Sequence, residues 1–284
     1  MIFGLGAAVG WGFADVTAAL VARRIGSFRT LVFANFAGLL LLTVLVAATP
    51  VSFPALHPGL VGLPLIGILG AISYVAFYRA LELGPIALVS PVAAGYAAIV
   101  IGLSLLVLGE RVPGPALIGA GLTTVGVVLA STAPRGRGLE RTRPGRAGMP
   151  YAVVAMIGFG VGAFLIGRYS KDVGWFGAIF LSRLGSSATL LVFLLARQSR
   201  PSRRVPLSIA GTATLVGLLD VMGFASFARG TELGFITITA AASVTYPLIP
   251  IVSGVIYLRE RPQPTQWLGV AVVIGGLLFL ALGR

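Results

Sequence analysis

The chain alternates between long apolar runs and short polar segments. Runs of about 18–23 residues would cross roughly 30 Å of hydrocarbon as helices. Lipid offers no partner to a backbone N–H or C=O group, so spans must be helices or strands of a closed barrel. Barrel strands would be about 10 residues long and would alternate in polarity, so the pattern predicts helices. We expect ten spans, at about residues 2–22, 30–48, 60–80, 86–108, 115–132, 150–168, 175–196, 207–228, 235–257 and 264–283.

The composition supports a membrane protein. Of 284 residues, 57% are hydrophobic and 10% are charged, whereas a soluble domain carries roughly 25% charged residues. The mean hydropathy is +1.00. The chain has no Cys, which excludes disulfides and thiol chemistry, and its single His57 makes no metal site by itself. We therefore expect an all-α membrane protein without cofactor or metal.

The net charge of +13 comes from arginines in short segments between the expected spans. This distribution is typical of topology signals, not of a surface that binds nucleic acid. With ten spans, four basic segments share one side of the membrane. The positive-inside rule places them in the cytoplasm and both termini outside. These segments contain Arg23, Arg24 and Arg29; Arg135, Arg137, Arg141, Arg143 and Arg146; Arg197, Arg200, Arg203 and Arg204; and Arg259 and Arg261.

Two pairs of similar stretches reveal an internal repeat. "ALELGPIALVSPVAAGYAAIVIGLSLLVLGERVP" from Ala80 resembles "GTELGFITITAAASVTYPLIPIVSGVIYLRERPQ" from Gly230, and "GWGFADVTAALVARRIG" from Gly10 resembles "GFGVGAFLIGRYSKDVG" from Gly158. The chain thus divides into residues 1–132, a basic linker at 133–149, and residues 150–284. Five spans per half predict that the second copy is inverted, a construction favoured by secondary transporters. A duplication retained only for packing is the alternative.

Several short motifs carry a family resemblance. The "WGF" at 11–13, Arg183, and the "LGER" and "LRER" that end spans four and nine resemble the ten-helix, EamA-like branch of the drug/metabolite transporter superfamily. The resemblance implies ten helices around a central cavity, in the inner membrane of a bacterial or archaeal cell. It also implies export of amino acids, small metabolites or drugs. Two positions depart from the pattern: Asn35 replaces the counterpart of Arg183, and Ala97 replaces that of Pro247.

Three ionisable side chains fall at membrane depth, where each must be paired or hydrated. They are Asp15, Arg183 and Asp220. A carboxylate beside aromatic rings suits an ammonium or organic cation, whereas the alternative is an Asp that pairs with Arg183 and locks helices together. Arg183 could bind a solute carboxylate or extend its head to the interface. The predicted solute-binding residues are Trp11, Asp15, Tyr74, Tyr78, Arg183, Asp220, Phe224, Ser243 and Tyr246.

Other residue types have structural interpretations. Pro91, Pro247 and Pro250 remove backbone donors inside spans, and such interruptions border the substrate path in transporters or are simple kinks. Small residues let membrane helices approach closely, which is the role we expect of Gly102, Gly119, Gly121 and Gly126. Acidic residues beside arginines at span ends predict hydrated ion pairs, with a gate pair as the alternative. These residues are Glu82, Glu110, Glu232 and Glu260.

The favoured function is a secondary-active exporter of small organic solutes. No phosphate-cradling nucleotide loop is visible, and the usual nucleophile and base of an enzyme are missing. We expect no enzymatic activity. The partners expected are the lipid bilayer, a small-molecule substrate and protons as coupling ion, since an apolar cavity lets a carboxylate exchange a proton near physiological pH. A homodimer is left open, as are a facilitator or exchanger of sugar- or nucleotide-type metabolites and a non-transporting scaffold.

Overall fold

The structure is a computed structural model of the chain. It describes residues 1–48, 58–84, 86–130, 147–196, 205–250, 252–253 and 264–282, and these contain helices but no strand. The predicted all-α class is therefore confirmed for this part of the chain. The α-helices are α1 (Ile2–Ile25), α2 (Ser27–Ala48), α3 (Gly62–Leu83), α4 (Ile86–Ala94), α5 (Tyr96–Leu106), α6 (Gly114–Ala130), α8 (Met149–Val173), α9 (Trp175–Ala196), α10 (Leu207–Leu233), α11 (Ile236–Ser243) and α13 (Pro264–Leu282); a 3₁₀ turn at Pro58–Val61 precedes α3.

Most of these helices are long and apolar enough to cross a membrane. In the described residues eight segments qualify: α1, α2, α3, α8, α9, α10, α13 and the segment Val89–Leu106, which joins the end of α4 to α5. Two shorter apolar segments, Gly114–Ala130 and Ile236–Pro250, accompany them. Eight of the expected spans thus coincide with segments of spanning length, and the other two, 115–132 and 235–257, coincide in their described residues with the shorter segments. Two of the ten segments are interrupted.

The first interruption lies at Gly95, between α4 and α5. There the backbone N–H of Gly95 donates to Val92 O at 3.1 Å and that of Ala98 to Gly95 O at 3.1 Å, so the chain tightens to three-residue spacing. A Cβ at Gly95 would lie 2.6 Å from Met156 Sδ of α8. The helix continues through Pro91, and the break falls at Gly95, beside Met156 of α8.

The second interruption ends α11 at Ser243. Proline has no N–H, so Pro247 cannot bond the carbonyl of Ser243 four residues earlier. The N–H of Tyr246 donates to Ser243 O instead, at 3.2 Å, and Leu248 continues the three-residue spacing with a 3.0 Å bond to Thr245 O. The interruption expected at Pro247 is confirmed, and it starts a tightly wound segment that contains Tyr246.

The bundle is apolar outside and partly polar inside. Leu40 of α2 and Leu278 of α13 are among many large apolar side chains that face outward, at 65% and 62% exposure. Asp15, Arg183 and Asp220 are all buried. A soluble protein has the opposite arrangement, because its surface must interact with water.

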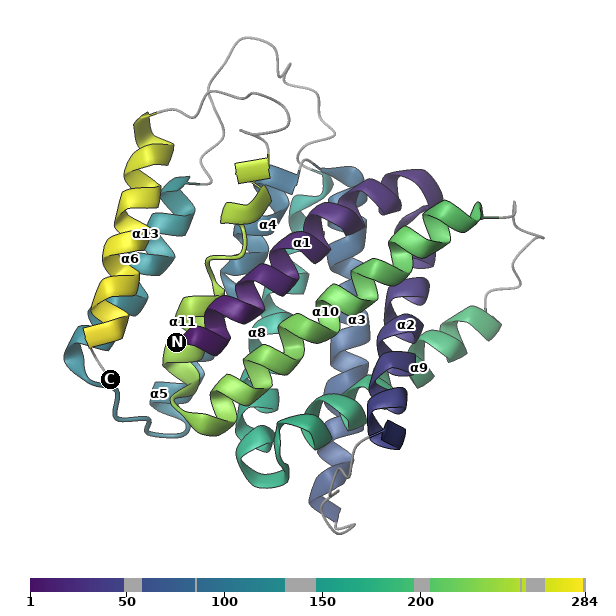
Figure 1. Ribbon diagram of the computed structural model, residues 1–284, viewed down its shortest axis with the longest axis horizontal. Coiled ribbons are helices and arrows are strands. Elements are labelled where there is room, and N and C mark those ends of the chain that lie inside the picture. Colours follow the sequence, from purple (N-terminus) through teal and green to yellow (C-terminus); the bar gives the residue numbers. More distant parts are fainter. Residues whose placement is uncertain are drawn as a thin grey trace.

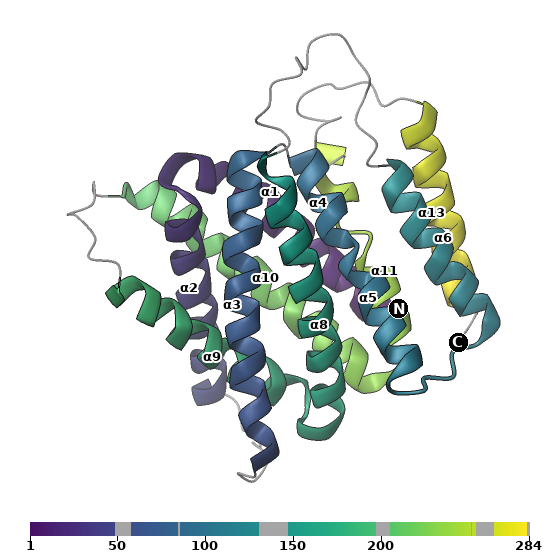
Figure 2. The ribbon, with the colours of Figure 1, turned by 180° about the vertical axis from the view of Figure 1, so that it is seen from behind.

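Helices from residues 1–130 pack mainly against helices from residues 149–282. Helix α1 lies along α10, and α8 lies along α3; Figure 1 shows the first pair and Figure 2 the second. Helix α2 contacts α10, and α9 contacts α3. Helices α6 and α13 form a further pair at one side of the bundle. The centre of the bundle is therefore lined by both parts of the chain.

Glycines bring α6 and α13 together. A Cβ at Gly119 would lie 2.5 Å from the backbone nitrogen of Leu280, and one at Gly126 would lie 2.6 Å from that of Val273. The packing role predicted for these two glycines is confirmed. For Gly102 and Gly121 it is wrong, because a Cβ there would meet nothing within 4 Å.

The acidic residues at helix ends differ from one another. Glu82 pairs with Arg79 at 3.0 Å and Glu232 with Arg229 at 2.6 Å, with partly exposed side chains, so the prediction of hydrated helix-end pairs is confirmed for both. Glu260 lies outside the described residues. For Glu110 the prediction is wrong: its side chain is 7% exposed and contacts Lys171, not its neighbour Arg111.

We predict that Gly126→Leu destabilises the protein, whereas Gly121→Leu does not. A larger side chain at Gly126 would overlap the backbone of α13, and overpacking of this kind costs about 1–3 kcal/mol. The measurement is thermal unfolding of the purified protein in detergent. Equal melting temperatures for the two variants would contradict this account of the α6–α13 contact.

Candidate functional site

A cavity of about 110 Å³ lies at the centre of the bundle. On this measure one water needs about 10–15 Å³, so the cavity has room for several waters or a small organic group. Its wall comes from α1, α2, α3, α5, α8, α9, α10 and the segment after α11. The polar and aromatic lining residues are Trp11, Asp15, Asn35, Tyr74, Phe77, Tyr78, Tyr96, Phe159, Ser182, Arg183, Ser186, Asp220, Phe224 and Tyr246.

One end of the cavity contains a buried ion pair. Arg183 Nη2 of α9 lies 2.5 Å from Asp220 Oδ2 of α10, with both side chains less than 10% exposed. The Tyr74 hydroxyl of α3 donates to the other oxygen of Asp220, and the guanidinium carbon lies 5.9 Å from the centre of the Phe224 ring. Arg183 therefore points inward, and the alternative in which it extends to the interface is wrong.

Asn35 occupies the position next to this ion pair. Its Nδ2 donates to Ser186 Oγ at 2.9 Å, and Ser187 Oγ donates to its Oδ1 at 2.5 Å. Ser186 Oγ in turn donates to the carbonyl of Arg183 at 3.0 Å. The departure from the family pattern at Asn35 thus places a neutral amide at the cavity, joined to the turn of α9 that carries Arg183.

The second carboxylate has no cationic partner among the residues that the structure describes. Asp15 is 8% exposed, and its Oδ2 accepts a 3.3 Å hydrogen bond from Ser90 Oγ. Tyr246 donates to the backbone carbonyl of Ser90 at 2.9 Å, so the same short segment of α4 contacts both. Within this cavity one guanidinium faces two carboxyl groups, and the carboxyl group of Asp15 has no cationic partner among the described residues.

Aromatic rings connect the two carboxylates. The Trp11 ring lies 5.2 Å from Phe224 and 6.2 Å from Tyr96, both edge to face. Tyr74 lies 4.9 Å from Phe159 and 5.8 Å from Tyr78 in the same geometry. The electron-rich faces of such rings attract cations, and this wall lies beside the carboxyl group of Asp15.

Trp11 fits because α10 has a glycine at the crossing. A Cβ at Gly223 would lie 2.5 Å from the Trp11 ring, and one at Gly10 would lie 2.7 Å from the Gly223 nitrogen. The indole Nε1 is buried, and no residue in the described part of the chain accepts its hydrogen. The structure thus holds one unused donor within the wall.

The structure brings together eight of the nine side chains predicted to bind solute. Ser243 is the exception, because it lies behind Tyr96. Its Oγ donates to Ala240 O at 2.9 Å, and the hydroxyl of Tyr96 contacts that Oγ at 2.5 Å. Because the hydroxyl hydrogen of Ser243 is already donated to Ala240 O, the Tyr96 hydroxyl is the donor in the contact between the two side chains. Ser243 therefore positions a ring of the cavity without lining the cavity itself.

Sequence reasoning missed six of the polar and aromatic lining residues: Asn35, Phe77, Tyr96, Phe159, Ser182 and Ser186. A signal existed for Tyr96, because the internal repeat aligns it with Tyr246, which was included. No comparable signal existed for Phe159 or Ser186. They are ordinary residues of apolar helices, and only the packing of α8 and α9 turns them inward.

Comparisons with known proteins agree with this architecture. A family model described as the EamA-like transporter family matches residues 1–132 and 146–282. A solved crystal structure, described only as that of a protein, superposes with a TM-score of 0.78 at 18% identity, over 99% of this chain and 96% of the other. At that identity the similarity shows the fold alone. No curated protein matches the chain significantly. With its apolar helices, the chain is an integral, multi-pass membrane protein.

We predict strong coupling between Arg183 and Asp220 in stability. Arg183→Gln or Asp220→Asn leaves a buried charge without its partner, which costs about 3–5 kcal/mol. The double variant removes both charges, so it should lose clearly less than the two single losses combined. Unfolding of the three variants in detergent measures this. Additive losses would mean that the ion pair does not hold α9 and α10 together.

Proposed function

The chain belongs to the EamA-like transporter family, and from that premise we propose that it is a secondary-active transporter. It lies in the inner membrane of a bacterial or archaeal cell and exports amino acids or other small organic metabolites or drugs across that membrane by alternating access. The observation that carries the proposal is the central cavity, where an uncompensated carboxylate lies within an aromatic wall.

The proposed architecture is ten helices in two inverted repeats of five. Eight spans are the long apolar segments, of which Val89–Leu106 is interrupted. The ninth is Gly114–Ala130, a continuous short helix, and the tenth is the interrupted segment Ile236–Pro250. The main helix contacts support a two-fold relation between the halves, because they exchange when the two halves are exchanged; five spans in each half would make this relation an inversion. The pair α1–α10 becomes α8–α3, and the pair α2–α10 becomes α9–α3. Interrupted helices near a site between two repeats are a common feature of transporters.

The charges in the cavity favour a solute with an ammonium or another cationic group. Arg183 is already paired with Asp220, so Asp15 supplies the net negative charge. The aromatic faces of Trp11 and Tyr96 add cation–π attraction. A solute carboxylate, where one is present, can bind at the guanidinium of Arg183. A zwitterionic amino acid and an organic cation both satisfy this arrangement, whereas a dianion does not.

Proton coupling through Asp15 accounts for export against a gradient. Asp220 is already ion-paired with Arg183, whereas Asp15 accepts a hydrogen bond from the hydroxyl of Ser90 and has no cationic partner among the described residues. A proton and a cationic solute therefore compete for Asp15. Each solute that leaves the carboxylate is replaced by a proton, which is released on the other side of the membrane.

The test of function is flux into proteoliposomes with and without an imposed pH gradient. Solutes that raise the melting temperature of the purified protein, from a panel of amino acids, sugars and cationic drugs, are the ones to assay. Wild-type protein should transport faster with the gradient. Asp15→Asn should abolish transport against a concentration gradient while it spares downhill exchange more. Asp172→Asn, at an exposed pair with Arg168, is the matched control and should behave as wild type.

Each other result has a definite meaning. Flux that ignores the pH gradient would make the protein a facilitator or exchanger. No flux with any stabilising solute would favour a scaffold. Normal uphill transport by Asp15→Asn would remove this residue from the coupling mechanism.

Orientation gives an independent prediction. The basic segments identify the cytoplasmic side, so reporter fusions should place both termini outside the cytoplasm, although proteins of this superfamily are usually drawn with cytoplasmic termini. Activity of a terminal alkaline phosphatase fusion would agree with the charge distribution. Fluorescence of a terminal green fluorescent protein, which does not fold after export in an unfolded state, would contradict it.

A further inference from the structure

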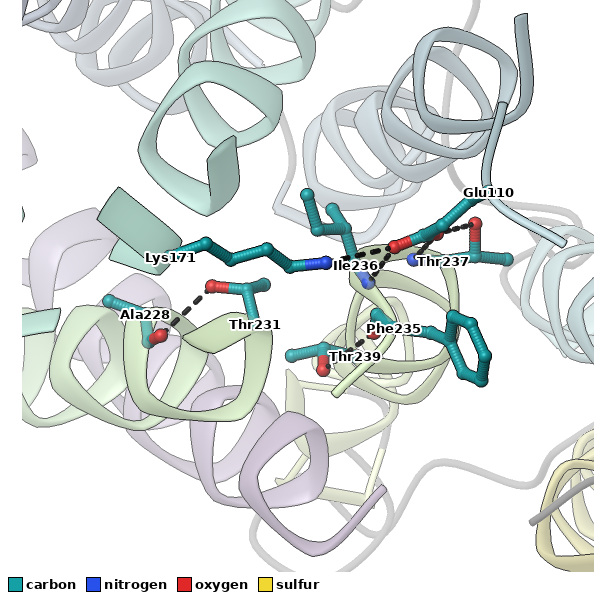
Figure 3. A network of polar contacts seen from close by, with 8 residues as sticks. All are labelled: Glu110, Lys171, Ala228, Thr231, Phe235, Ile236, Thr237 and Thr239. Carbon is teal, nitrogen blue, oxygen red and sulfur yellow. Dashed lines mark hydrogen bonds and ion pairs between the residues drawn. The ribbon is translucent and has the colours of Figure 1, made fainter. Parts of the chain in front are cut away.

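Glu110 is tied to the opposite half of the protein. It follows the end of α5, where Gly109 has a φ of 61°, a left-handed conformation that glycine adopts at little cost. The N–H of Glu110 donates back to Ser104 O at 3.1 Å. This turn directs the side chain toward Ile236 and Thr237 at the beginning of α11, as Figure 3 shows.

The carboxylate of Glu110 caps α11. One oxygen accepts from the N–H of Ile236 at 2.8 Å, and the other from the N–H and hydroxyl of Thr237 at 3.1 and 2.8 Å. The first N–H groups of a helix have no partner within it, and a negative charge is favourable at that end. Glu110 therefore satisfies donors that would otherwise be buried and unpaired.

Lys171 completes this contact from the end of α8. Its Nζ lies 3.5 Å from Glu110 Oε1. Three segments are thus joined at one point: the turn after α5, the end of α8 and the beginning of α11 (Figure 3). We call the group of Glu110, Lys171, Ile236 and Thr237 the α11 latch.

The α11 latch is connected to the cavity through a short rigid helix. Eight residues of α11 span about 12 Å, and all eight are buried. At the far end, Ser243 holds Tyr96 and the following segment carries Tyr246, both of which line the cavity. Between the two ends, Ile236, Ala240 and Val244 pack with Phe164 and Phe227 in one cluster. An apolar cluster that includes α11 therefore lies between the cavity and the latch.

The internal repeat relates Lys171 to a second basic residue, Arg23. Shifts of 148 and 150 residues align Arg23 with Lys171 and Glu260 with Glu110. Arg23 Nη2 donates to Gly84 O at 3.4 Å, two residues before α4 begins, so this cation occupies a place related to that of Lys171. Arg23 therefore contacts the chain just before α4, whereas Lys171 contacts the carboxylate that caps α11; Glu260 lies outside the described residues.

We propose that the α11 latch is the gate that closes the cavity toward the end of the bundle where α11 begins. The solute passes on that side only after Glu110 releases α11 and Lys171, which lets α11 move away from α8. This inference rests on the proposed transport function, but its test needs no solute.

The test measures access to a single cysteine in the cavity wall. The chain has no Cys, so Ser182→Cys introduces one reporter at a lining position. A membrane-impermeant maleimide is applied to right-side-out and inside-out vesicles, and the labelling rate is measured from each side. Glu110→Gln keeps the shape of the side chain but loses the ion pair with Lys171. Its amide nitrogen would face an N–H group of α11, which is also a donor, so that hydrogen bond is lost as well.

We expect Glu110→Gln to raise labelling from the α11 side by roughly tenfold, because charge-assisted hydrogen bonds are lost from the closed state only. Lys171→Met should act in the same direction by about threefold, since the bonds to α11 remain. Glu232→Gln is the matched control at the same end of the bundle, at an exposed pair with Arg229, and should label as the parent.

Unchanged labelling in both latch variants, or faster labelling from the opposite side only, would overturn the proposal. If Glu110→Gln fails to give a monodisperse protein, the milder Lys171→Met decides. Absence of flux in proteoliposomes alongside the expected labelling would refute transport but leave the gate intact. Flux in proteoliposomes alongside unchanged labelling would support transport and refute the gate.

Discussion

Polar groups inside this bundle must find their partners inside it, because lipid provides none. The ion pair between Arg183 and Asp220 is the largest instance. It joins α9 to α10, and Tyr74 extends it to α3. The cavity lies beside this ion pair, and its wall combines aromatic rings with small residues such as Gly67 and Gly70. Close helix crossings, such as that of Gly10 with Gly223, give these groups the geometry that they need.

Much of this arrangement could be predicted from sequence, since it depends on features that one chain displays. Long apolar runs indicate membrane helices, and charges within them indicate a site. The repeat, aligned without any structure, pointed to Tyr246 and could have pointed to Tyr96. The hydrogen-bond and ion-pair partners of the charged residues are harder to predict from sequence. Asp15 and Asp220 look alike in sequence, and only packing shows that Asp220 has Arg183 beside it while Asp15 has Ser90.

Other features depended on contacts between distant parts of the chain. Glu110 stands beside Arg111, so a local helix-end pair was the natural prediction, yet it bonds residues 126 and 127 positions later. Gly119 and Gly121 lie on the same short helix, but only Gly119 faces α13. The helix breaks at Gly95, which lies beside Met156 of α8, and not at Pro91. In each case the sequence shows a residue with the required property, and the tertiary contact determines which one is used.

The packing of each half on the other has a consequence for synthesis. A ribosome delivers α1 to α6 to the membrane well before α13, and α6 packs chiefly against α13, with α11 as its other neighbour. The glycine face of α6 therefore stays without its main partner until the last helix has been inserted. Likewise α1 lacks its main packing partner until α10 has been made, and α3 lacks its main partners until α8 and α9 have been made. Nascent chains should accordingly be recognised as incomplete by membrane chaperones and proteases until translation ends, and a truncation before α13 should be degraded rather than accumulate as a half-built protein.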